Sequence, residues 1–415
     1  MGAKDLESLA RRVRAASRQV ARASSAVRDD ALRAAADLLE SDAAGVLAAN
    51  TEDLERAERD GVDSTSLDRL RLTTARVEQM ADGLRSVAAL SDPVGEVVDG
   101  WVRPNGLRVE RVRVPLGVVG IIYENRPNVT SDAAGLCVKA GNAAFLRGSS
   151  TALASNRAVV SVLRRAMSKA GLPEDAVALV EDVSHESAVA FMRLRGLVDC
   201  LVPRGGKTLI ASLLEHATVP YVLDGEGNCH VYVDASADVD VAERIVVNAK
   251  TQRPGVCNAA ETLLVHAEIA PVLLGRLSRS LAGVELVADD RARAYLPTAA
   301  PATEEDFATE FLALKLAVAV VDDLDGAIDH IARFGSGHSE AIVTRDVASA
   351  DRFTREVDAA AVLVNASTRF VDGGELGLGA EVGISTQKLH ARGPMGLREL
   401  TSVKWVVRGD GHVRE

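Results

Sequence analysis

The chain of 415 residues has few cysteines, no excess of basic side chains and no long apolar segment. Four cysteines are too few for a disulfide framework at this length, so we expect reduced thiols. With 48 basic and 59 acidic side chains the net charge is -11, which disfavours binding to a nucleic-acid backbone. No apolar run could span a bilayer, and the first residues do not resemble a signal peptide. These absences favour a cytoplasmic protein with neither nucleic acid nor membrane as partner.

Sequence patterns of metal sites are also missing. The eight histidines include no His-Glu-x-x-His pair and the cysteines no Cys-x-x-Cys motif, so we predict no metal site. The sequence does have a hydrophobic fraction of 47% with 26% charged residues, which is typical of globular proteins. Because a chain of this length can bury two substantial cores, we expect two domains.

The order of helical and strand-like segments indicates the architecture. Up to about Leu90 the chain is rich in Ala, Arg, Leu and Glu at helical spacing, so helices are predicted. Asn105-Gly106 separates two alternating segments within Trp101–Val114 and predicts a protruding β-hairpin. Because such a ribbon is marginal alone, we expect a partner surface to cover it. The alternating tail Leu400–Val407 is a candidate strand to pair with it.

After the hairpin, short apolar runs alternate with helical stretches. The runs predicted as strands are Val118–Ile122, Ala143–Leu146, Ala176–Val180, Val198–Val202 and Val219–Val222. Thr151–Ala170 is predicted as a helix, because Gly171 and Pro173 follow it as a typical C-terminus. Apolar strands that alternate with helices indicate a parallel sheet covered on both faces. A second strand–helix series runs over Thr262–Val364, so we place a domain boundary near Asp234.

Cys257 has the surroundings of a reactive thiol. It lies in the polar loop Gln252–Asn258, which contains Pro and Gly, with Lys250 and Arg253 near enough to favour the thiolate. The other three cysteines have aliphatic neighbours and are expected to be buried; they are Cys137, Cys200 and Cys229. Since the thiolate is the nucleophile, Cys257 is the candidate catalytic residue, with a structural cysteine as the alternative.

Polar turns follow three of the predicted strands. Arg204-Gly205-Gly206-Lys207 precedes a predicted helix, where backbone N–H groups and two basic side chains favour an anion, although a plain solvated turn is the alternative. Leu201 stands where a P-loop needs glycine, which disfavours an ATPase. Asn125 could donate to a developing oxyanion or simply stabilise its loop. Arg147 and Ser149 could bind a phosphate or ribose, since ligands gather at the carboxyl ends of parallel strands.

Four motifs are the most specific features of the sequence. They are Tyr123–Thr130, the Cys257 loop, Val364–Phe370 and Ser385–Gly396. Through them nearly the whole chain resembles the gamma-glutamyl phosphate reductases (glutamate-5-semialdehyde dehydrogenases) of the aldehyde dehydrogenase superfamily. The resemblance implies an α/β fold with two domains, each a largely parallel sheet flanked by helices, plus an oligomerisation element of hairpin and C-terminal strand. The implied parts are an NADPH-binding domain at 1–234 with its hairpin at about 99–114, a catalytic domain at 235–372 and a C-terminal return at 373–415.

The resemblance also implies roles for single residues. Cys257 would displace phosphate from L-glutamyl 5-phosphate as a thioester, and hydride from NADPH would then give glutamate 5-semialdehyde, the second step of proline biosynthesis. Asn125 is similar to the superfamily's oxyanion-hole asparagine, and Glu310 matches the glutamate that holds the nicotinamide ribose. Further cofactor positions are Arg147 and Ser149 at the adenosine ribose and 2′-phosphate, and Arg204, Gly205, Gly206 and Lys207 at the diphosphate. Implied substrate-binding residues are Arg253, Ser367 and Arg369, with His338, His390 and Arg392 as weaker candidates.

One stretch departs from the superfamily members that oxidise aldehydes to acids. Those enzymes carry a water-activating glutamate in a Glu-Leu-Gly-Gly pattern that Leu223–Gly227 lacks, although Asp224 and Glu226 stay open as substitutes. The missing base fits reduction. An acid-forming aldehyde dehydrogenase is the alternative, and a cofactor-binding protein without catalysis is a third interpretation. The resemblance further implies a homo-oligomer and raises a glutamate kinase as a partner.

Overall fold

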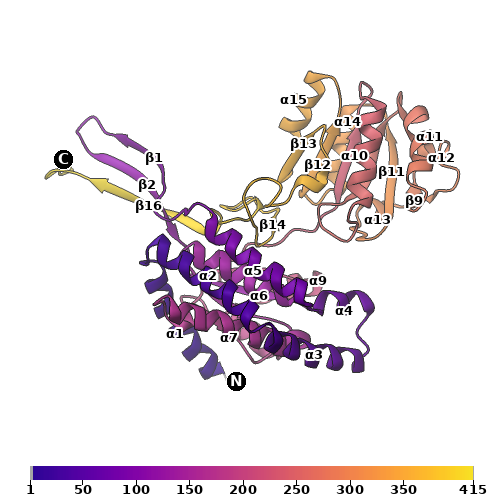
Figure 1. Ribbon diagram of the computed structural model, residues 1–415. Helices are drawn as coiled ribbons and strands as arrows, with labels where there is room; N and C mark the ends of the chain where they lie inside the picture. The colour runs from indigo at the N-terminus through magenta and orange to yellow at the C-terminus, as the bar shows by residue number, and fades with distance from the viewer. Residues whose placement is uncertain (1–2, 415) are drawn as a thin grey trace. The chain divides into compact units, whose positions relative to one another are not determined.

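The computed structural model describes residues 3–414, apart from the side chains of Ala3 and Thr65, and divides the chain into two compact units (Figure 1). The first unit contains the chain up to Leu223, together with Leu378–Gly383 and the segment from Met395 onward. The second contains Asp224–Gly377 and Ile384–Pro394. None of the described helices is both long enough and apolar enough to cross a membrane.

The units divide the chain differently from the expected ranges 1–234, 235–372 and 373–415. Strand β7 (Cys229–Val233) precedes the expected boundary at Asp234, but it pairs with strands of the second unit on both sides. The predicted C-terminal segment is shared, because 384–394 belongs to the second unit and the rest of the return mostly to the first. A boundary placed by composition misses such returns, because they depend on tertiary pairing.

Helices form the start of the first unit, as predicted. They are α1 (Ala3–Val20), α2 (Ser25–Ser41), α3 (Ala43–Arg59), α4 (Ser64–Leu70) and α5 (Thr74–Ala89). In α2 the buried residues Leu32, Ala35, Ala36 and Leu39 recur every three to four positions, which gives one apolar face. The side chains of Ser24, Asp63 and Thr73 cap α2, α4 and α5 by accepting backbone hydrogen bonds.

A four-stranded parallel sheet with the order β5-β4-β3-β6 forms the core of the first unit. Its strands are β3 (Val118–Tyr123), β4 (Ala143–Arg147), β5 (Val177–Leu179) and β6 (Cys200–Arg204). The intervening helices are α6 (Pro127–Lys139), α7 (Leu153–Lys169), α8 (His185–Met192) and α9 (Lys207–His216). Four predicted strands and the helix predicted over Thr151–Ala170 are confirmed. The strand predicted at Val219–Val222 is wrong, because around Pro220, which has no N–H, only the single bridge Leu201–Tyr221 forms.

The predicted hairpin and its pairing with the tail are confirmed. Strands β1 (Val97–Val102), β2 (Arg108–Pro115) and β16 (Thr401–Arg408) form an antiparallel sheet in the order β1-β2-β16 (Figure 1). Gly106 has φ +93° at the turn, a conformation that favours glycine. The rings of Trp101 and Trp405 meet edge to face with centroids 5.6 Å apart.

A seven-stranded parallel sheet with the order β10-β9-β11-β8-β7-β12-β13 forms the second unit. Besides β7, its strands are β8 (Ala260–His266), β9 (Glu285–Ala288), β10 (Ala300–Pro301), β11 (Lys315–Val321), β12 (Ser339–Val343) and β13 (Ala361–Val364). The main helices are α10 (Val239–Thr251), α11 (Ala270–Ser280), α14 (Leu324–Phe334) and α15 (Val347–Glu356). Two apolar clusters cover opposite faces, one with α10 and α11 and one with α14 and α15. Two short strands, β14 (Ile384–Ser385) and β15 (Gly393–Pro394), pair separately.

Candidate active site

Cys257 lies between α10 and β8 and differs from the other three cysteines in exposure. It is partly exposed, whereas Cys137, Cys200 and Cys229 are buried, as predicted. Burial raises the pKa of each of these three thiols. Of the four, only Cys257 combines access for a ligand with a polar loop, which are the conditions a nucleophilic thiolate needs.

The backbone of Cys257 packs against Gly227, so closely that a Cβ at position 227 would overlap the Cys257 carbonyl oxygen. Glu310 Oε1 accepts a hydrogen bond from the Gly227 N–H at 2.9 Å. The Cys229 thiol donates to the Cys257 carbonyl oxygen at 3.2 Å. The expected ribose-binding glutamate and the expected nucleophile are therefore held by the same glycine, a contact between distant segments for which the sequence contains no signal.

Lys250 has a different partner from the one expected. It is fully buried, and its Nζ lies 2.5 Å from Oε2 of the equally buried Glu261. Burial lowers the pKa of Lys250 and raises that of Glu261 to about 7, while each charge opposes the other shift. Glu261 Oε1 accepts from the N–H of Leu312 at 3.2 Å, two residues after Glu310. The pair thus supports the Glu310 segment, and Arg253 is left as the exposed basic residue of the loop.

The three expected substrate-binding residues belong to the surroundings of Cys257. Arg369 Nε donates to Gln252 Oε1 at 2.8 Å, which joins its loop to the Cys257 loop. Burial and then the charge of Arg253 lower the pKa of Arg369, while negative groups that include Cys257 raise it. Ser367 is buried, and its Oγ accepts from the Arg369 N–H at 3.3 Å. Two guanidinium groups thus act electrostatically on this loop.

The weaker candidates have other contacts. His338 is buried, with Nδ1 2.8 Å from Ser339 Oγ and 3.7 Å from Cys229 Sγ, and burial lowers its pKa to about 4. Arg392 forms an ion pair with Asp358 at 2.8 Å. A neutral buried imidazole and a paired guanidinium are poor choices for binding a substrate carboxylate.

Asp224 is one of the two carboxylates considered as a water-activating base. Its Oδ1 accepts from the N–H of Ile384 at 2.9 Å, so it holds β14 in place. His390 is exposed. Over residues 3–414, no group of three or more His, Cys, Asp or Glu side chains could hold a metal ion.

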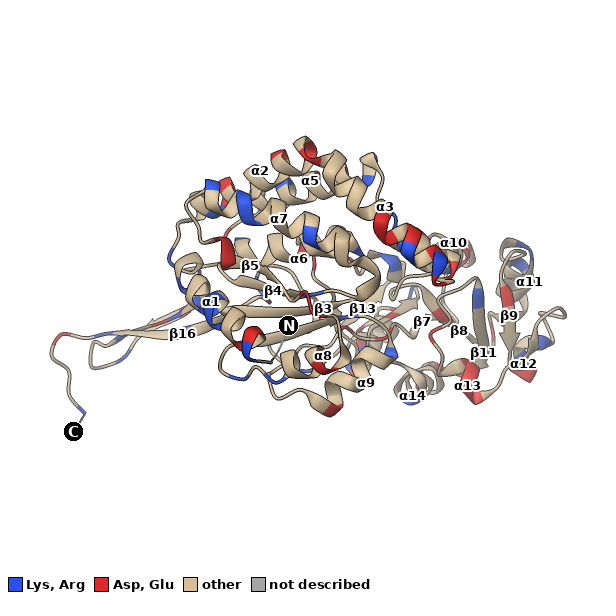
Figure 2. Cartoon of the chain, turned by 90° about the horizontal axis from the view of Figure 1, so that it is seen from below, with Lys and Arg blue, Asp and Glu red and all other residues tan. Residues whose placement is uncertain are grey.

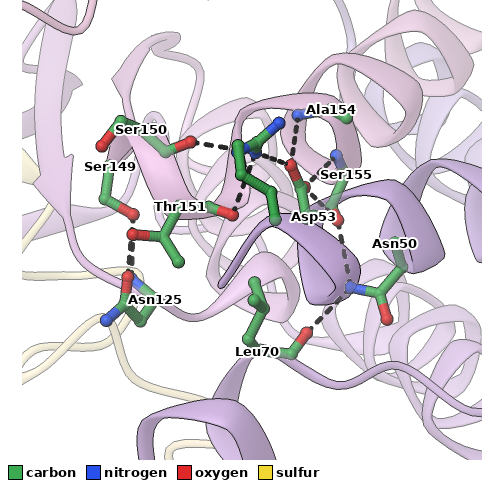
Figure 3. Close-up of polar contacts among 10 residues, drawn as sticks. Asn50, Asp53, Leu70, Asn125, Ser149, Ser150, Thr151, Ala154 and Ser155 are labelled. Atoms are coloured by element: carbon green, nitrogen blue, oxygen red, sulfur yellow. Dashed lines mark hydrogen bonds and ion pairs between the residues drawn. The ribbon is translucent and has the colours of Figure 1, made fainter. Parts of the chain in front are cut away.

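In the first unit, Asn125 occupies the turn between β3 and α6. Its φ is +40°, a left-handed conformation that asparagine tolerates better than most residues. Ser149 Oγ donates to Asn125 Oδ1 at 3.0 Å and accepts from the Asn125 N–H at 3.3 Å. With the oxygen held in this way, the amide nitrogen points away from Ser149 (Figure 3) and is the group that can donate to a ligand.

The sequence analysis missed two residues of α3 that hold the turn after Ser149 and the start of α7. Asp53 of α3 is buried and accepts from the N–H groups of Ala154 and Ser155 at 3.2 and 2.7 Å, which caps α7 from another helix (Figure 3). Arg56 donates to two carbonyl oxygens of the turn after Ser149, at 3.2 and 3.3 Å. The C-terminal half of α3 carries many charged residues (Figure 2), so the sequence did not distinguish Asp53 among them.

The glycine turn after β6 holds a carboxylate of its own unit. Gly206 N–H donates to Glu124 Oε2 at 3.1 Å, and a Cβ on Gly205 would lie 2.7 Å from the same oxygen. Helix α9 begins at Lys207, so the carboxylate sits at a helix N-terminus, where anions are favoured. The Gly206 N–H at the start of α9 can therefore bind an anion, and in this structure the Glu124 carboxylate is bound to it.

Arg147 is the last residue of β4 and bridges to the segment after β5. Its Nη2 donates to the carbonyl oxygens of Val183 and Ser184 at 2.8 and 3.0 Å. Its buried Nε has no hydrogen-bond partner among the described residues. Burial lowers the pKa of Arg147, and the charges of Asp182 and Glu124 raise it. Two backbone carbonyl groups thus hold the guanidinium through Nη2.

Comparison with known proteins places the chain in a family. The family model described as "Aldehyde dehydrogenase family" matches residues 1–305. The chain belongs to this family. It is similar to the gamma-glutamyl phosphate reductase of Thermobifida fusca (strain YX), at 54% identity over 413 residues and 99% of both proteins. It is also similar to that of Carboxydothermus hydrogenoformans, at 55% identity over 408 residues and 98% of both.

Solved structures agree with this assignment. Gamma-glutamyl phosphate reductase from Thermotoga maritima matches with a TM-score of 0.96 at 47% identity, covering 98% of this chain and 99% of that one. An acetylating aldehyde dehydrogenase from Geobacillus thermoglucosidasius matches with a TM-score of 0.70 at 18% identity, covering 100% and 98%, which shows the fold alone. The predicted fold class is confirmed, and family membership implies an oxidoreductase with a nicotinamide cofactor.

Proposed function

We propose that the chain reduces L-glutamyl 5-phosphate to L-glutamate 5-semialdehyde with NADPH and releases phosphate, the second step of proline biosynthesis from glutamate. The observation that carries this proposal is the partly exposed Cys257 in a chain that matches gamma-glutamyl phosphate reductases over 99% of its length. The missing Glu-Leu-Gly-Gly pattern supports reduction over hydrolysis, and so does the engagement of Asp224 with Ile384.

The proposed chemistry uses Cys257 as the acyl carrier. Its thiolate attacks the acyl carbon, the carbon–oxygen bond to phosphate breaks, and a thioester remains on Sγ. Bound NADPH supplies the hydride. Cys257 then leaves as the tetrahedral adduct on its sulfur collapses to the aldehyde. Asn125 Nδ2 and the Cys257 N–H are the proposed oxyanion donors, each worth about 3 kcal/mol in the transition state.

Residues of the first unit fit the adenosine end of NADPH. We assign Arg147 and Ser149 to the ribose and its 2′-phosphate, because both lie at the carboxyl end of β4, where parallel sheets bind their ligands. The diphosphate is assigned to the run from Arg204 through Gly205 and Gly206 to Lys207, at the N-terminus of α9, where it would replace the Glu124 carboxylate on the Gly206 N–H. Glu310 is assigned to the nicotinamide ribose. A preference for NADPH over NADH follows, because Arg147 is assigned to the 2′-phosphate, which NADH lacks.

Bound substrate is assigned to the surroundings of the nucleophile. Arg253 and Arg369 carry the positive charge suited to an acyl phosphate and a carboxylate. Ser367 supports them by capping the turn that carries Arg369.

The reverse reaction tests the function most directly. Semialdehyde oxidation with NADP should depend strictly on added phosphate, because acyl transfer from Cys257 to phosphate replaces hydrolysis. Aldehyde oxidation to a free carboxylate without phosphate would instead identify an acid-forming aldehyde dehydrogenase. The product is distinguished by its reaction with hydroxylamine, which traps acyl phosphates.

We also propose that the chain forms a homo-oligomer through the sheet β1-β2-β16. Its exposed large apolar side chains are Val97, Val98, Trp101, Val102, Trp405 and Val407. Apolar side chains on an open-edged sheet favour a covering surface, for which a second copy is the simplest source. Deleting residues 101–111 should lower the mass measured by light scattering; an unchanged mass would exclude the hairpin from assembly.

A further inference from the structure

One carboxylate near the Asn125 turn has no part in the proposed chemistry. Asp132 lies on α6, seven residues after Asn125, and is half-buried. Asn128 Nδ2 donates to Asp132 Oδ2 at 3.0 Å, whereas Oδ1 accepts only a 3.4 Å bond from Ser131 Oγ among the described residues. Because each carboxylate oxygen can accept two hydrogen bonds, Oδ1 retains most of its capacity.

The neighbouring helix α5 packs against α6 (Figure 1) and faces this oxygen with a glycine. Gly83 lies in the interior of α5, where glycine costs about 1 kcal/mol of helix stability relative to alanine. A Cβ on Gly83 would have one neighbour within 4 Å, and that neighbour is Asp132 Oδ1 at 3.7 Å. A side chain at position 83 would therefore cover the carboxylate, and the unfavourable glycine keeps it open.

The electrostatic surroundings of Asp132 favour a cationic ligand. Burial raises its pKa to about 6, and the hydrogen bonds from Asn128 and Ser131 and the charge of Arg204 lower it. Asp132 forms no ion pair with a described residue, and the charge of Arg204 compensates its burial only in part. A ligand cation at Oδ1 would favour the ionised carboxylate and supply that compensation.

We propose that Asp132 binds the α-ammonium group of the amino-acid substrate and so selects it over an aldehyde without that group. This inference rests on the proposed function. The spacing agrees with it, because a rise of about 1.5 Å per residue puts Asp132 about 7.5 Å along α6 from its first residue, Pro127, and Asn125 lies two residues before that helix. A glutamyl group of roughly 5 Å between carbonyl carbon and nitrogen, with a hydrogen bond of about 3 Å at each end, spans a similar length.

The test compares two aldehydes in the phosphate-dependent reverse assay. L-Glutamate 5-semialdehyde carries the ammonium group, and 5-oxopentanoate has the same carbon chain without it. Asp132→Asn keeps the size of the side chain and removes its charge. We expect kcat/KM for the amino aldehyde to fall by about 10- to 100-fold, mainly through KM, with kcat/KM for 5-oxopentanoate unchanged.

Two further variants separate recognition from folding. Gly83→Ala should raise KM for the amino aldehyde while the melting temperature stays the same or rises, because alanine is the better helix former. Asp82→Asn changes the adjacent carboxylate of α5, whose side chain is 74% exposed and paired with Arg85, and should leave both substrates unaffected.

The outcomes distinguish the two levels of the proposal. An equal loss on both aldehydes in Asp132→Asn would show that Asp132 is structural and would overturn its role in recognition. Absence of phosphate-dependent turnover by the wild-type protein on either aldehyde would overturn the proposed function itself.

Discussion

The Cys257 loop and the Asn125 turn carry the two expected catalytic groups, but different forces hold them. Behind the Cys257 loop lie a close glycine contact and the buried ion pair Lys250–Glu261. The Asn125 turn rests on the neutral hydroxyl of Ser149. A buried pair is costly to break, because the remaining charge stays buried, whereas loss of a hydroxyl removes single hydrogen bonds. Substitutions behind the Cys257 loop should therefore cause large losses of stability or activity, whereas substitutions at the Asn125 turn should cause smaller ones.

The largest expected effect is that of Cys257→Ser. A hydroxyl is not ionised near neutral pH, so no acyl-enzyme forms and reduction is lost, while NADPH binding stays close to that of the wild type. Stopped-flow absorbance measures the reduction, and fluorescence titration measures the binding. Turnover near the wild-type rate would disprove the thioester mechanism.

The second-largest effect is expected when the buried ion pair between Lys250 and Glu261 is broken. Lys250→Met leaves the Glu261 carboxylate buried without its partner and should lower the free energy of unfolding by about 3 to 5 kcal/mol. Urea unfolding measures this loss. The double variant Lys250→Met with Glu261→Gln removes both charges and keeps an acceptor for the Leu312 N–H, so it should be less destabilised than Lys250→Met alone. A double variant with the summed loss of both single variants would show that the two charges are not coupled.

Asn125→Ala tests the turn directly. Removal of one oxyanion donor should lower kcat by roughly 100-fold, as at other oxyanion holes, and stability should fall by about 1 kcal/mol because alanine disfavours the left-handed φ of Asn125. The rate of thioester formation in a single turnover measures the effect. If kcat fell only a few fold, Asn125 would stabilise its loop and would not be an oxyanion donor.

The smallest effect is expected from Ser149→Ala. It removes the hydroxyl that orients the Asn125 amide, which costs about 1 kcal/mol, or roughly 5-fold in kcat. Ser150→Ala is the matched control, because that neighbouring side chain is exposed. Equal rates for the two variants would mean that the Asn125 amide is oriented by other contacts.

The sequence predicted those parts of the fold that depend on local patterns. The apolar runs of β3 and β4 and the Asn105-Gly106 turn stand out because a strand or a hairpin needs those residues in succession. Val219–Val222 has the same apolar character, but one bridge to Leu201 is all that forms there. The pattern of a strand does not reveal whether a partner is available to pair with it.

Site residues were predictable by type but not by partner. Cys257 stood out because its loop is polar, and it is the partly exposed cysteine. Lys250 was expected to favour its thiolate, yet it is buried against Glu261 of the following strand. Asp53 and Gly227 gave no signal, because their importance comes from α7 and Cys257, each distant in sequence. Contacts between distant segments are the part that a single sequence does not reveal.

The contact between Gly227 and Cys257 limits how this enzyme could be re-engineered. A designer who wanted a water-activating carboxylate beside the nucleophile, to turn a phosphate-releasing reductase into an acid-forming oxidase, would look first at the stretch before β7. Position 227 is closed to every side chain, since even a methyl group would collide with the Cys257 carbonyl oxygen. The new base would have to come from another position, so a substitution at residue 227 alone does not bring about the change of reaction.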